Sequence, residues 1–256
     1  YAASIALILH ALAKPGNGMW IEDPGFPLIR PIVTRHDVEI LPVPVDDNGL
    51  DITSGIQNYP DARFALITPA HQSPLGVALS LARRHQILEW ADRSQAWIIE
   101  DDYDSEFRYH GKPLPALKSL DAPQRVIYAG TFSKALFPAL RCAWLVLPVK
   151  QIAQFRHQAS LAPCAVPVLW QNTLADFLRE GHFWRHLKKM RQHYAQRRQW
   201  IEQALTQQGF QVVPQKGGIQ MVIRMIGDDI AHARKANAAG LAVQALSDWR
   251  IRSSGE

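Results

Sequence analysis

The sequence contains few cysteines and no long apolar run. Cys142 and Cys164 are the two cysteines among 256 residues, and they have neither the spacing of a metal site nor the density of a disulfide-stabilised secreted protein. No apolar stretch is long enough to cross a bilayer, and the first residues lack the basic region of a signal peptide. We therefore expect a cytoplasmic protein with no membrane partner.

An excess of either charge is also missing. The formal net charge is +5, 20% of the residues are charged and 47% are apolar, which is ordinary for a globular protein with a sizeable core. A mild positive charge permits contact with nucleic acid or anionic metabolites but does not argue for either. Because the chain opens inside an apolar helical pattern with no capping segment before it, we expect a fragment of a longer protein.

Short β-rich runs alternate with helical stretches between about Met19 and Pro148. This alternation is typical of a parallel sheet covered by helices. The expected strands are residues 19–22, 38–42, 64–68, 97–100, 126–129 and 143–146. The expected helices are residues 4–13, 28–35, 80–94 and 149–159.

The composition changes after Pro167. We expect helices over residues 168–180 and 183–208, and the second keeps its apolar residues three and four apart, so one face should lie along a neighbour. Strands at 210–213 and 219–223, a helix at 232–246 and a last strand near 249–252 should follow. The sequence thus predicts a large unit of residues 1–181, then a linking helix with a partial small α+β domain over residues 182–256.

The expected strand 126–129 runs into a segment rich in hydroxyl groups that contains Lys134. A lysine after a strand is usually only a solvated charge. Here Thr131 and Ser133 precede it and Arg141 follows, and hydroxyls with the forked guanidinium of arginine suit a phosphate. A lysine amine beside a phosphate site is what pyridoxal phosphate (PLP) requires, because the amine forms a Schiff base with its aldehyde.

The expected strand 97–100 ends in two adjacent acids, Asp101 and Asp102. Such a pair often caps a helix or lies in a surface turn. At the carboxyl end of a strand, where open α/β sheets bind ligands, one of the two could instead keep the pyridine nitrogen of PLP protonated. Tyr103, the next residue, could donate to the phenolic oxygen of the cofactor.

Two further turns follow expected strands. Residues 68–76 form either a simple proline and glycine loop or a site wall in which Ser73 or Gln72 faces the ring oxygen of the cofactor. Residues 22–26 form either a plain turn or a platform on which Phe26 stacks against the ring.

Several of these segments resemble the aminotransferase-like domain of MocR/GabR-type transcriptional regulators. The resemblance lies in residues 100–109 (EDDYDSEFRY), 113–118 (PLPALK), 130–134 (GTFSK), 22–26 (EDPGF), 74–76 (PLG) and 181–198. Such regulators join an N-terminal winged helix of the GntR type to a fold-type I PLP domain. The resemblance implies a large three-layer α/β/α domain with a mixed, mostly parallel sheet and part of a small α+β domain.

The resemblance also implies roles for single residues. Lys134 would carry PLP, Asp101 would pair with the pyridine nitrogen and Tyr103 with the phenolic oxygen. The other implied cofactor-binding residues are Thr131, Ser133 and Arg141 at the phosphate, Phe26 against the ring, and Ser73 where plain aminotransferases have asparagine.

The sequence departs from the family pattern at several points. Phe26 stands where tyrosine is common, and Leu75 replaces a small hydroxyl residue. The phosphate-binding turn should lie at or before Tyr1. The arginine that binds a substrate carboxylate should lie near the end of the chain, where Arg250 and Arg252 are weak candidates.

The helix expected over residues 183–208 carries histidines and many basic residues. His182, His186 and His193 share one face, but no carboxylate or cysteine completes a ligand set, so we expect no metal. A basic cluster could contact DNA, although we expect it to face solvent or a neighbouring domain. Its members are Arg185, Lys188, Lys189, Arg191, Arg197 and Arg198.

The sequence therefore predicts an effector-sensing, PLP-binding domain of a bacterial regulator. We expect a homodimer that binds an amine or amino acid and reaches DNA only through a domain absent from this chain. One alternative is a free-standing aminotransferase that acts on an amino acid, and another is a sensor of PLP itself. Whether the site turns over a substrate stays open.

Overall fold

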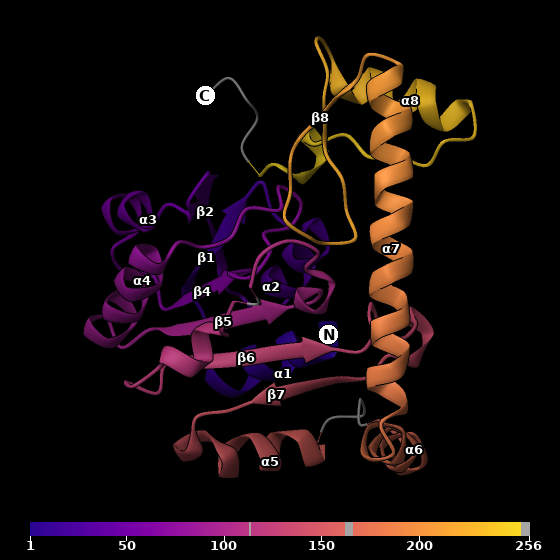
Figure 1. The fold of residues 1–256 in the computed structure, drawn as a ribbon. Coiled ribbons are helices and arrows are strands. Elements are labelled where there is room, and N and C mark those ends of the chain that lie inside the picture. Colours follow the sequence, from indigo (N-terminus) through magenta and orange to yellow (C-terminus); the bar gives the residue numbers. More distant parts are fainter. Residues whose placement is uncertain (113, 162–165, 252–256) are drawn as a thin grey trace.

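A computed structural model describes residues 1–112, 114–161 and 166–251 (Figure 1). Two residues discussed above, Cys164 and Arg252, lie outside the described residues, as does Pro113 of the 113–118 motif. None of the helices within the described ranges combines the length and the apolar character that a membrane crossing requires.

A seven-stranded sheet forms the centre of the molecule, in the order β3-β2-β1-β4-β5-β6-β7. Neighbours from β2 to β6 are parallel, whereas β3 and β7 are antiparallel edge strands. The sheet is therefore mixed and mostly parallel. Its strands are β1 Gly18–Asp23, β2 Glu39–Asp46, β3 Gly49–Leu50, β4 Phe64–Ile67, β5 Trp97–Asp102, β6 Val126–Thr131 and β7 Ala143–Val146.

Helices cover both faces of this sheet because successive strand residues point to opposite sides. In β4, Ala65 and Ile67 pack in one apolar cluster with residues of α3 and α4, whereas Phe64 and Leu66 pack in another with residues of α1, α2 and α5. Both faces of the parallel strands are thus buried, which is the rule for such sheets. The helices are α1 Ala2–Leu12, α2 Arg30–Thr34, α3 Ile52–Asn58, α4 Leu81–Arg93 and α5 Ile152–Leu161.

A long helix, α7 (His182–Gln207), follows α6 (Val168–Arg179) and stands along one side of the sheet (Figure 1). Phe183 and Leu187 in its first half are buried in a cluster with Phe107. Ile201 in its second half is 52% exposed. The expectation that one apolar face lies along a neighbour is therefore confirmed for the first half and is wrong at Ile201.

The C-terminal part departs most from the expectations. Its strands are short, β8 Gln211–Val212 and β9 Ile223–Arg224, so the strand expected over 219–223 is wrong except at its last residue. Helix α8 spans Asp229–Ala238 and ends near Gly240, whose φ of 88° leaves the helical region. A short 3-10 turn, Ser247–Trp249, replaces the last expected strand among the described residues. The proposed domain boundary at residue 181 stays a prediction.

Candidate cofactor site

The carboxyl ends of the parallel strands bring the expected site residues to one edge of the sheet. Asp101 near the end of β5 lies opposite Ala129 of β6, two residues before Thr131. Thr68 directly follows β4, and Glu22 lies near the end of β1. This edge is where open α/β sheets bind ligands.

Asp101 is a buried acid with a free oxygen. Its exposed fraction is 6%, and Oδ1 has no hydrogen-bond partner among the described residues. Burial, with smaller contributions from the charges of Asp102 and Glu22, raises the pKa of Asp101 to about 8, and the Tyr1 phenol opposes this shift. A carboxyl group in this state gains from a cationic partner, because an opposite charge restores the ionised form. The protonated ring nitrogen of PLP fits this requirement.

Asp102 has its oxygens occupied by protein groups. Its Oδ2 accepts hydrogen bonds from Ser105 Oγ at 2.8 Å and Tyr128 OH at 2.7 Å, and its Oδ1 accepts one from the Ser105 backbone N–H at 3.2 Å. Asp102 therefore holds the turn after β5. Of the two acids that the sequence left open, the structure favours Asp101 for the cofactor.

Thr131, Ser133 and Arg141 gather where β6 turns back towards β7. Thr131 Oγ1 donates to Ser133 Oγ at 3.0 Å and lies 3.3 Å from the Cys142 carbonyl, the residue next to Arg141. The start of α1 is also near, since the charge of Arg141 acts on the backbone nitrogen of Tyr1. Two hydroxyls and a helix N-terminus, with the charge of Arg141 acting on that terminus, are groups that suit a phosphate.

Among the described residues, no hydrogen bond or ion pair links Lys134 or Phe26 to the other expected site residues. The Lys134 side chain is exposed and makes no hydrogen bond or ion pair with any described residue. The ring of Phe26 lies 6.1 Å from that of Trp249, tilted by 53°. The roles of Lys134 and Phe26 stay predictions, as do the other residue assignments.

Tyr103 lies in a polar cluster that sequence reasoning missed in part. Its hydroxyl is 3.1 Å from His71 Nδ1, which is itself 3.2 Å from Asp104 Oδ2. Burial, and then the charge of Asp104, raise the pKa of Tyr103 well above its usual value, so the phenol keeps its proton at neutral pH. His71 could have been suspected from its place in the same polar turn as Ser73.

Ser73 meets a residue from the far end of the chain. Ser73 Oγ donates to Gln220 Oε1 at 3.1 Å, and Tyr103 OH lies 3.5 Å from the same oxygen. The second distance is at the outer limit of a hydrogen bond. The structure thus brings Ser73 and Tyr103 together on one amide oxygen, and Gln220 had no signal in the sequence.

Gln72, the other residue considered for the ring oxygen, is fully engaged within the protein. The two hydrogens of its Nε2 serve three acceptors, Glu22 Oε2 at 3.2 Å and the Pro24 and Ser73 carbonyls at 2.9 and 2.8 Å, while Oε1 accepts from the Leu75 N–H at 3.0 Å. Gln72 therefore fastens the 68–76 turn to β1. Ser73 is the better candidate for the cofactor.

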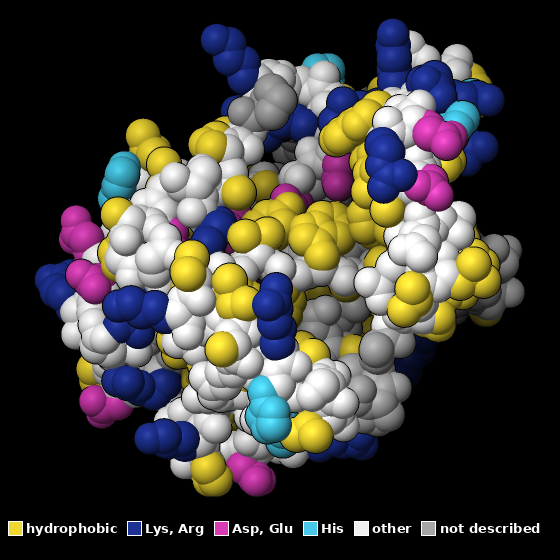
Figure 2. Space-filling view, turned by 90° about the horizontal axis from the view of Figure 1, so that it is seen from below, with side chains coloured by type: hydrophobic (Ala, Val, Ile, Leu, Met, Phe, Trp, Pro, Cys, Tyr) yellow, Lys and Arg dark blue, Asp and Glu magenta, His cyan; other side chains and the backbone are white. Residues whose placement is uncertain are grey.

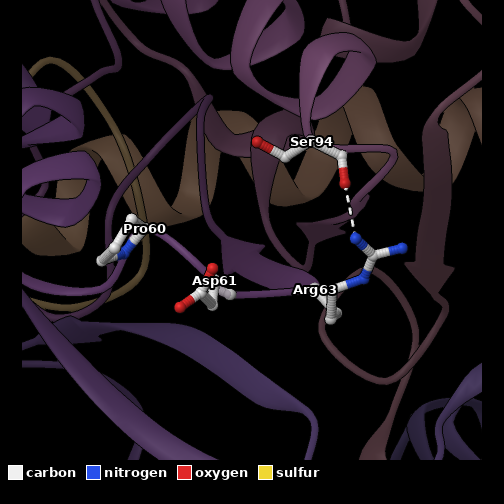
Figure 3. A pocket seen from close by; sticks show the side chains of 5 residues that line it. Pro60, Asp61, Arg63 and Ser94 are labelled. Carbon is white, nitrogen blue, oxygen red and sulfur yellow. Dashed lines mark hydrogen bonds between the residues drawn. The ribbon is translucent and has the colours of Figure 1, made fainter.

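The larger of two hollows described in the structure lies away from this site (Figure 3). It encloses about 470 Å³ beside Pro60, Asp61, Arg63 and Ser94, at the amino ends of the strands. Arg63 Nη1 donates to the Ser94 carbonyl at 2.7 Å, so part of its hydrogen-bonding capacity is used within the protein. A smaller cavity of about 200 Å³ does adjoin the site, next to His71 and Asp104.

The histidines and basic residues of α7 have separate surroundings. His186 Nε2 contacts the Ala135 carbonyl at 3.0 Å and His182 contacts Glu180 at 3.0 Å, and the described ranges hold no group of three potential metal ligands. Arg198 docks within the protein, on the carbonyls of Gly217 and Gln220. The other five members of the basic cluster have exposed side chains.

Comparison with protein families gives a match over almost the whole chain. The family "Aminotransferase class I and II" matches residues 1–252. The probable rhizopine catabolism regulatory protein MocR of Rhizobium meliloti is 37% identical over 195 residues, which are 76% of this chain and 39% of that protein. The pyridoxine biosynthesis transcriptional regulator PdxR of Corynebacterium glutamicum is 32% identical over 246 residues, 96% of this chain and 53% of that protein.

The chain therefore spans about half or less of the length of these curated relatives. Among solved structures, kynurenine aminotransferase of Pyrococcus horikoshii, in complex with PMP, superposes with a TM-score of 0.87 at 24% identity, over 97% of this chain and 65% of that one. The predicted fold, a three-layer aminotransferase-like α/β domain, is thereby confirmed.

Proposed function

This chain belongs to the class I and II aminotransferase family, and from that premise we propose that it is the PLP-binding, effector-sensing part of a MocR-type transcriptional regulator. Asp101 carries the proposal. It is a buried acid at the carboxyl edge of the sheet, and one of its oxygens has no hydrogen-bond partner among the described residues. Tyr103 and Ser73 lie on one side of the site, and the Thr131, Ser133 and Arg141 cluster lies by the start of α1.

PLP, when bound, supplies a cationic ring that draws electrons from an attached amine. In our proposal the residues of this chain set up that chemistry. Asp101 would hold the proton on the ring nitrogen, and the nearby positive charge would return the pKa of Asp101 towards its ordinary range. Tyr103 and Ser73 would donate to the phenolic oxygen, and Lys134 would supply the amine that bonds to the cofactor.

The phosphate end would be held by Thr131, Ser133 and Arg141. Their hydroxyls donate to phosphate oxygens, and the fixed fork of the guanidinium neutralises charge with two parallel hydrogen bonds. Arg141 has a φ of 53°, which turns the chain sharply before β7. We propose that this turn places the guanidinium beside the two hydroxyls.

We further propose that the chain forms a homodimer. Apolar side chains gather near the middle of the face that lies at the bottom of Figure 1, where β7, α5 and α6 are found (Figure 2). On α6, Leu169 is 73% exposed, and on α7, Trp184 is 62% exposed. Exposed apolar surface of this kind commonly marks an interaction site.

Partners beyond a second copy follow from the relatives. The relatives are described as transcriptional regulators and are about twice as long as this chain, so we propose that DNA is bound by a part outside it. The effector would be an amine or amino acid, the class of molecule that reacts with PLP. A cytoplasmic location stays a prediction.

Two alternatives have observations in their favour. The solved structure reported above is an enzyme, which supports a free-standing aminotransferase. PdxR is named for pyridoxine biosynthesis, which supports a sensor of PLP itself. Phe26 and Leu75 depart from the family pattern in the expected pocket, and we therefore prefer a site that binds amines with slow turnover or none.

The test uses the full-length protein with a DNA fragment from its own promoter. DNA affinity is measured with PLP and a panel of amines and amino acids, for the wild type and for Lys134→Ala. We expect one of these amines to change the DNA affinity of the wild type and to have no effect on Lys134→Ala. Rapid multiple turnover with an oxo-acid acceptor and no DNA binding would establish the free aminotransferase instead.

A further inference from the structure

Residues 215–220, here called the strap, cross from the C-terminal part to the carboxyl edge of the sheet. They belong to the long loop between β8 and β9, which hangs down towards the sheet beside α7 (Figure 1). The strap lies outside the strands, and an isolated antiparallel β-bridge pairs its Gly217 with Arg108. Both α7 and the candidate site contact the strap.

The strap is fastened to α7 by one arginine. Arg198 Nη1 donates to the Gly217 carbonyl at 3.2 Å and the Gln220 carbonyl at 3.0 Å, and Nη2 donates to Gln215 Oε1 at 3.2 Å. The Arg198 side chain is only 10% exposed. These bonds tie both ends of the strap to the helix.

The centre of the strap is bonded to the segment that follows β5. The Gly218 N–H donates to the Phe107 carbonyl at 2.8 Å, and the Ile219 N–H donates to Asp104 Oδ2 at 3.3 Å. Gly218 has a φ of 84°, and a Cβ there would lie 1.9 Å from the His71 ring. The strap therefore lies as close to the His71 and Tyr103 cluster as a backbone can.

Gln220 is the strap residue that enters the site. Its Oε1 accepts from Ser73 Oγ and lies within 3.5 Å of Tyr103 OH. Asp104 can only accept as a carboxylate, so the proton of His71 lies on Nδ1, between Asp104 and Tyr103. This leaves the Tyr103 hydrogen for Gln220. Each hydroxyl has one hydrogen, and Gln220 Oε1 is an acceptor within reach of both.

We propose that Gln220 competes with the phenolic oxygen of the cofactor for the hydrogens of Ser73 and Tyr103, and so links cofactor binding to the strap. A hydroxyl hydrogen donated to Gln220 cannot be donated to a second acceptor at the same time. When the hydroxyls turn to the cofactor, the strap loses its hold at residue 220. Because Arg198 bonds the strap to α7, a movement of the strap also changes the contacts of this helix. This inference rests on the proposed PLP site.

The first experiment measures PLP affinity in Gln220→Ala and in Gln215→Ala. Gln215 also holds the strap, donating to the Leu75 carbonyl at 3.0 Å, but it does not touch the two hydroxyls. Gln220→Ala frees both hydrogens, so we expect PLP to bind roughly 3- to 10-fold more tightly, the worth of one or two neutral hydrogen bonds. Gln215→Ala should bind PLP like the wild type. Unchanged or weaker binding by Gln220→Ala overturns the proposal.

The second experiment needs no cofactor. Hydrogen exchange of the backbone amides of Gly218 and Ile219 is compared between the wild type and the double variant Ser73→Ala, Tyr103→Phe. Faster exchange in the double variant is expected, because the hold at Gln220 is gone, and Ser133→Ala should match the wild type. Equal exchange in the double variant overturns the inference, whether or not PLP binds. Wild-type protein that fails to bind PLP would instead refute the proposed function.

Discussion

His71 Nδ1 lies 3.1 Å from the hydroxyl of Tyr103. The histidine ring is 8% exposed, and its other nitrogen, Nε2, is buried without a partner among the described residues. A tautomer with the proton on Nδ1 is consistent with both facts, since a buried lone pair costs less than a buried N–H. The His71 ring is held by the Asp104 carboxylate, and its Nδ1 in turn orients the Tyr103 phenol.

Replacing His71 should destabilise the protein. His71→Ala removes the bond to Tyr103, leaves Asp104 Oδ2 short of a donor and opens a cavity against Gly218. We expect a loss of about 2–4 kcal/mol in the free energy of unfolding, measured by urea titration. His193→Ala on the exposed face of α7 is the control and should change stability by less than about 0.5 kcal/mol. An unchanged free energy of unfolding in His71→Ala would show that the cluster does not stabilise this edge of the sheet.

Lys134 should be the point of covalent attachment of PLP. Protein mixed with PLP should gain a visible absorption band, and Lys134→Ala should lose it. Borohydride reduction followed by peptide mass spectrometry should find the cofactor on Lys134. An adduct on Lys118 or Lys150 would contradict the assignment.

Asp101 and Asp102 should separate in their effects on PLP binding. Asp101→Asn removes the charge that would pair with the ring nitrogen, and we expect PLP to bind at least about tenfold more weakly, equivalent to about 1.4 kcal/mol. Asp102→Asn should affect PLP less and instead lower stability, because it loses acceptor capacity for Ser105 and Tyr128. PLP titration and urea unfolding of both variants measure the two effects. A larger loss of PLP affinity in Asp102→Asn would reverse the choice.

The stability of the cofactor-free protein should depend on pH through Asp101. Burial raises its folded pKa to about 8 from an ordinary 3.8, so the folded state binds the proton more tightly than the unfolded state. Stability from this group is complete below about pH 4 and is lost as the pH rises towards 8. Asp101→Asn cannot ionise, and we expect it to be more stable than the wild type, with a difference that grows between pH 4 and 8.

Comparing the two proteins isolates Asp101. Burial also raises the pKa of Glu22 and Glu100 to about 7, and these acids titrate in both proteins. Thermal unfolding at pH 5, 6, 7 and 8 without PLP provides the measurement. Parallel curves for the two proteins would mean that Asp101 ionises in the folded state at no cost.

The central strands were predictable because their apolar runs are short and bounded by breakers. Strand β7 has the expected bounds, and the other five expected strands differ by a few residues at their ends. The sequence could also have shown that Asp101 and Asp102 face opposite sides of the sheet, because neighbouring strand residues do so. At most one of them can then face the cofactor. The sequence alone could not show which side carries Tyr128 and which is open.

The strap and Gln220 could not have been predicted from local pattern. Gln220 is 147 residues from Ser73 and 117 from Tyr103, and no periodicity connects positions so far apart. The apolar residues at 219–223 resemble a strand, but Asp104 and Phe107 take two of the strap's N–H groups. Tertiary hydrogen bonds decided the conformation of this segment against its propensity.

Because α7 is long, a small movement of the strap can displace the end of the helix by several ångströms. Its 26 residues correspond to a rod of about 39 Å. Its first half is clamped by Phe183 and Leu187, whereas Arg198 grips the strap in the second half. A tilt of about 5° about the packed first half would therefore move the far end of the helix by about 3 Å.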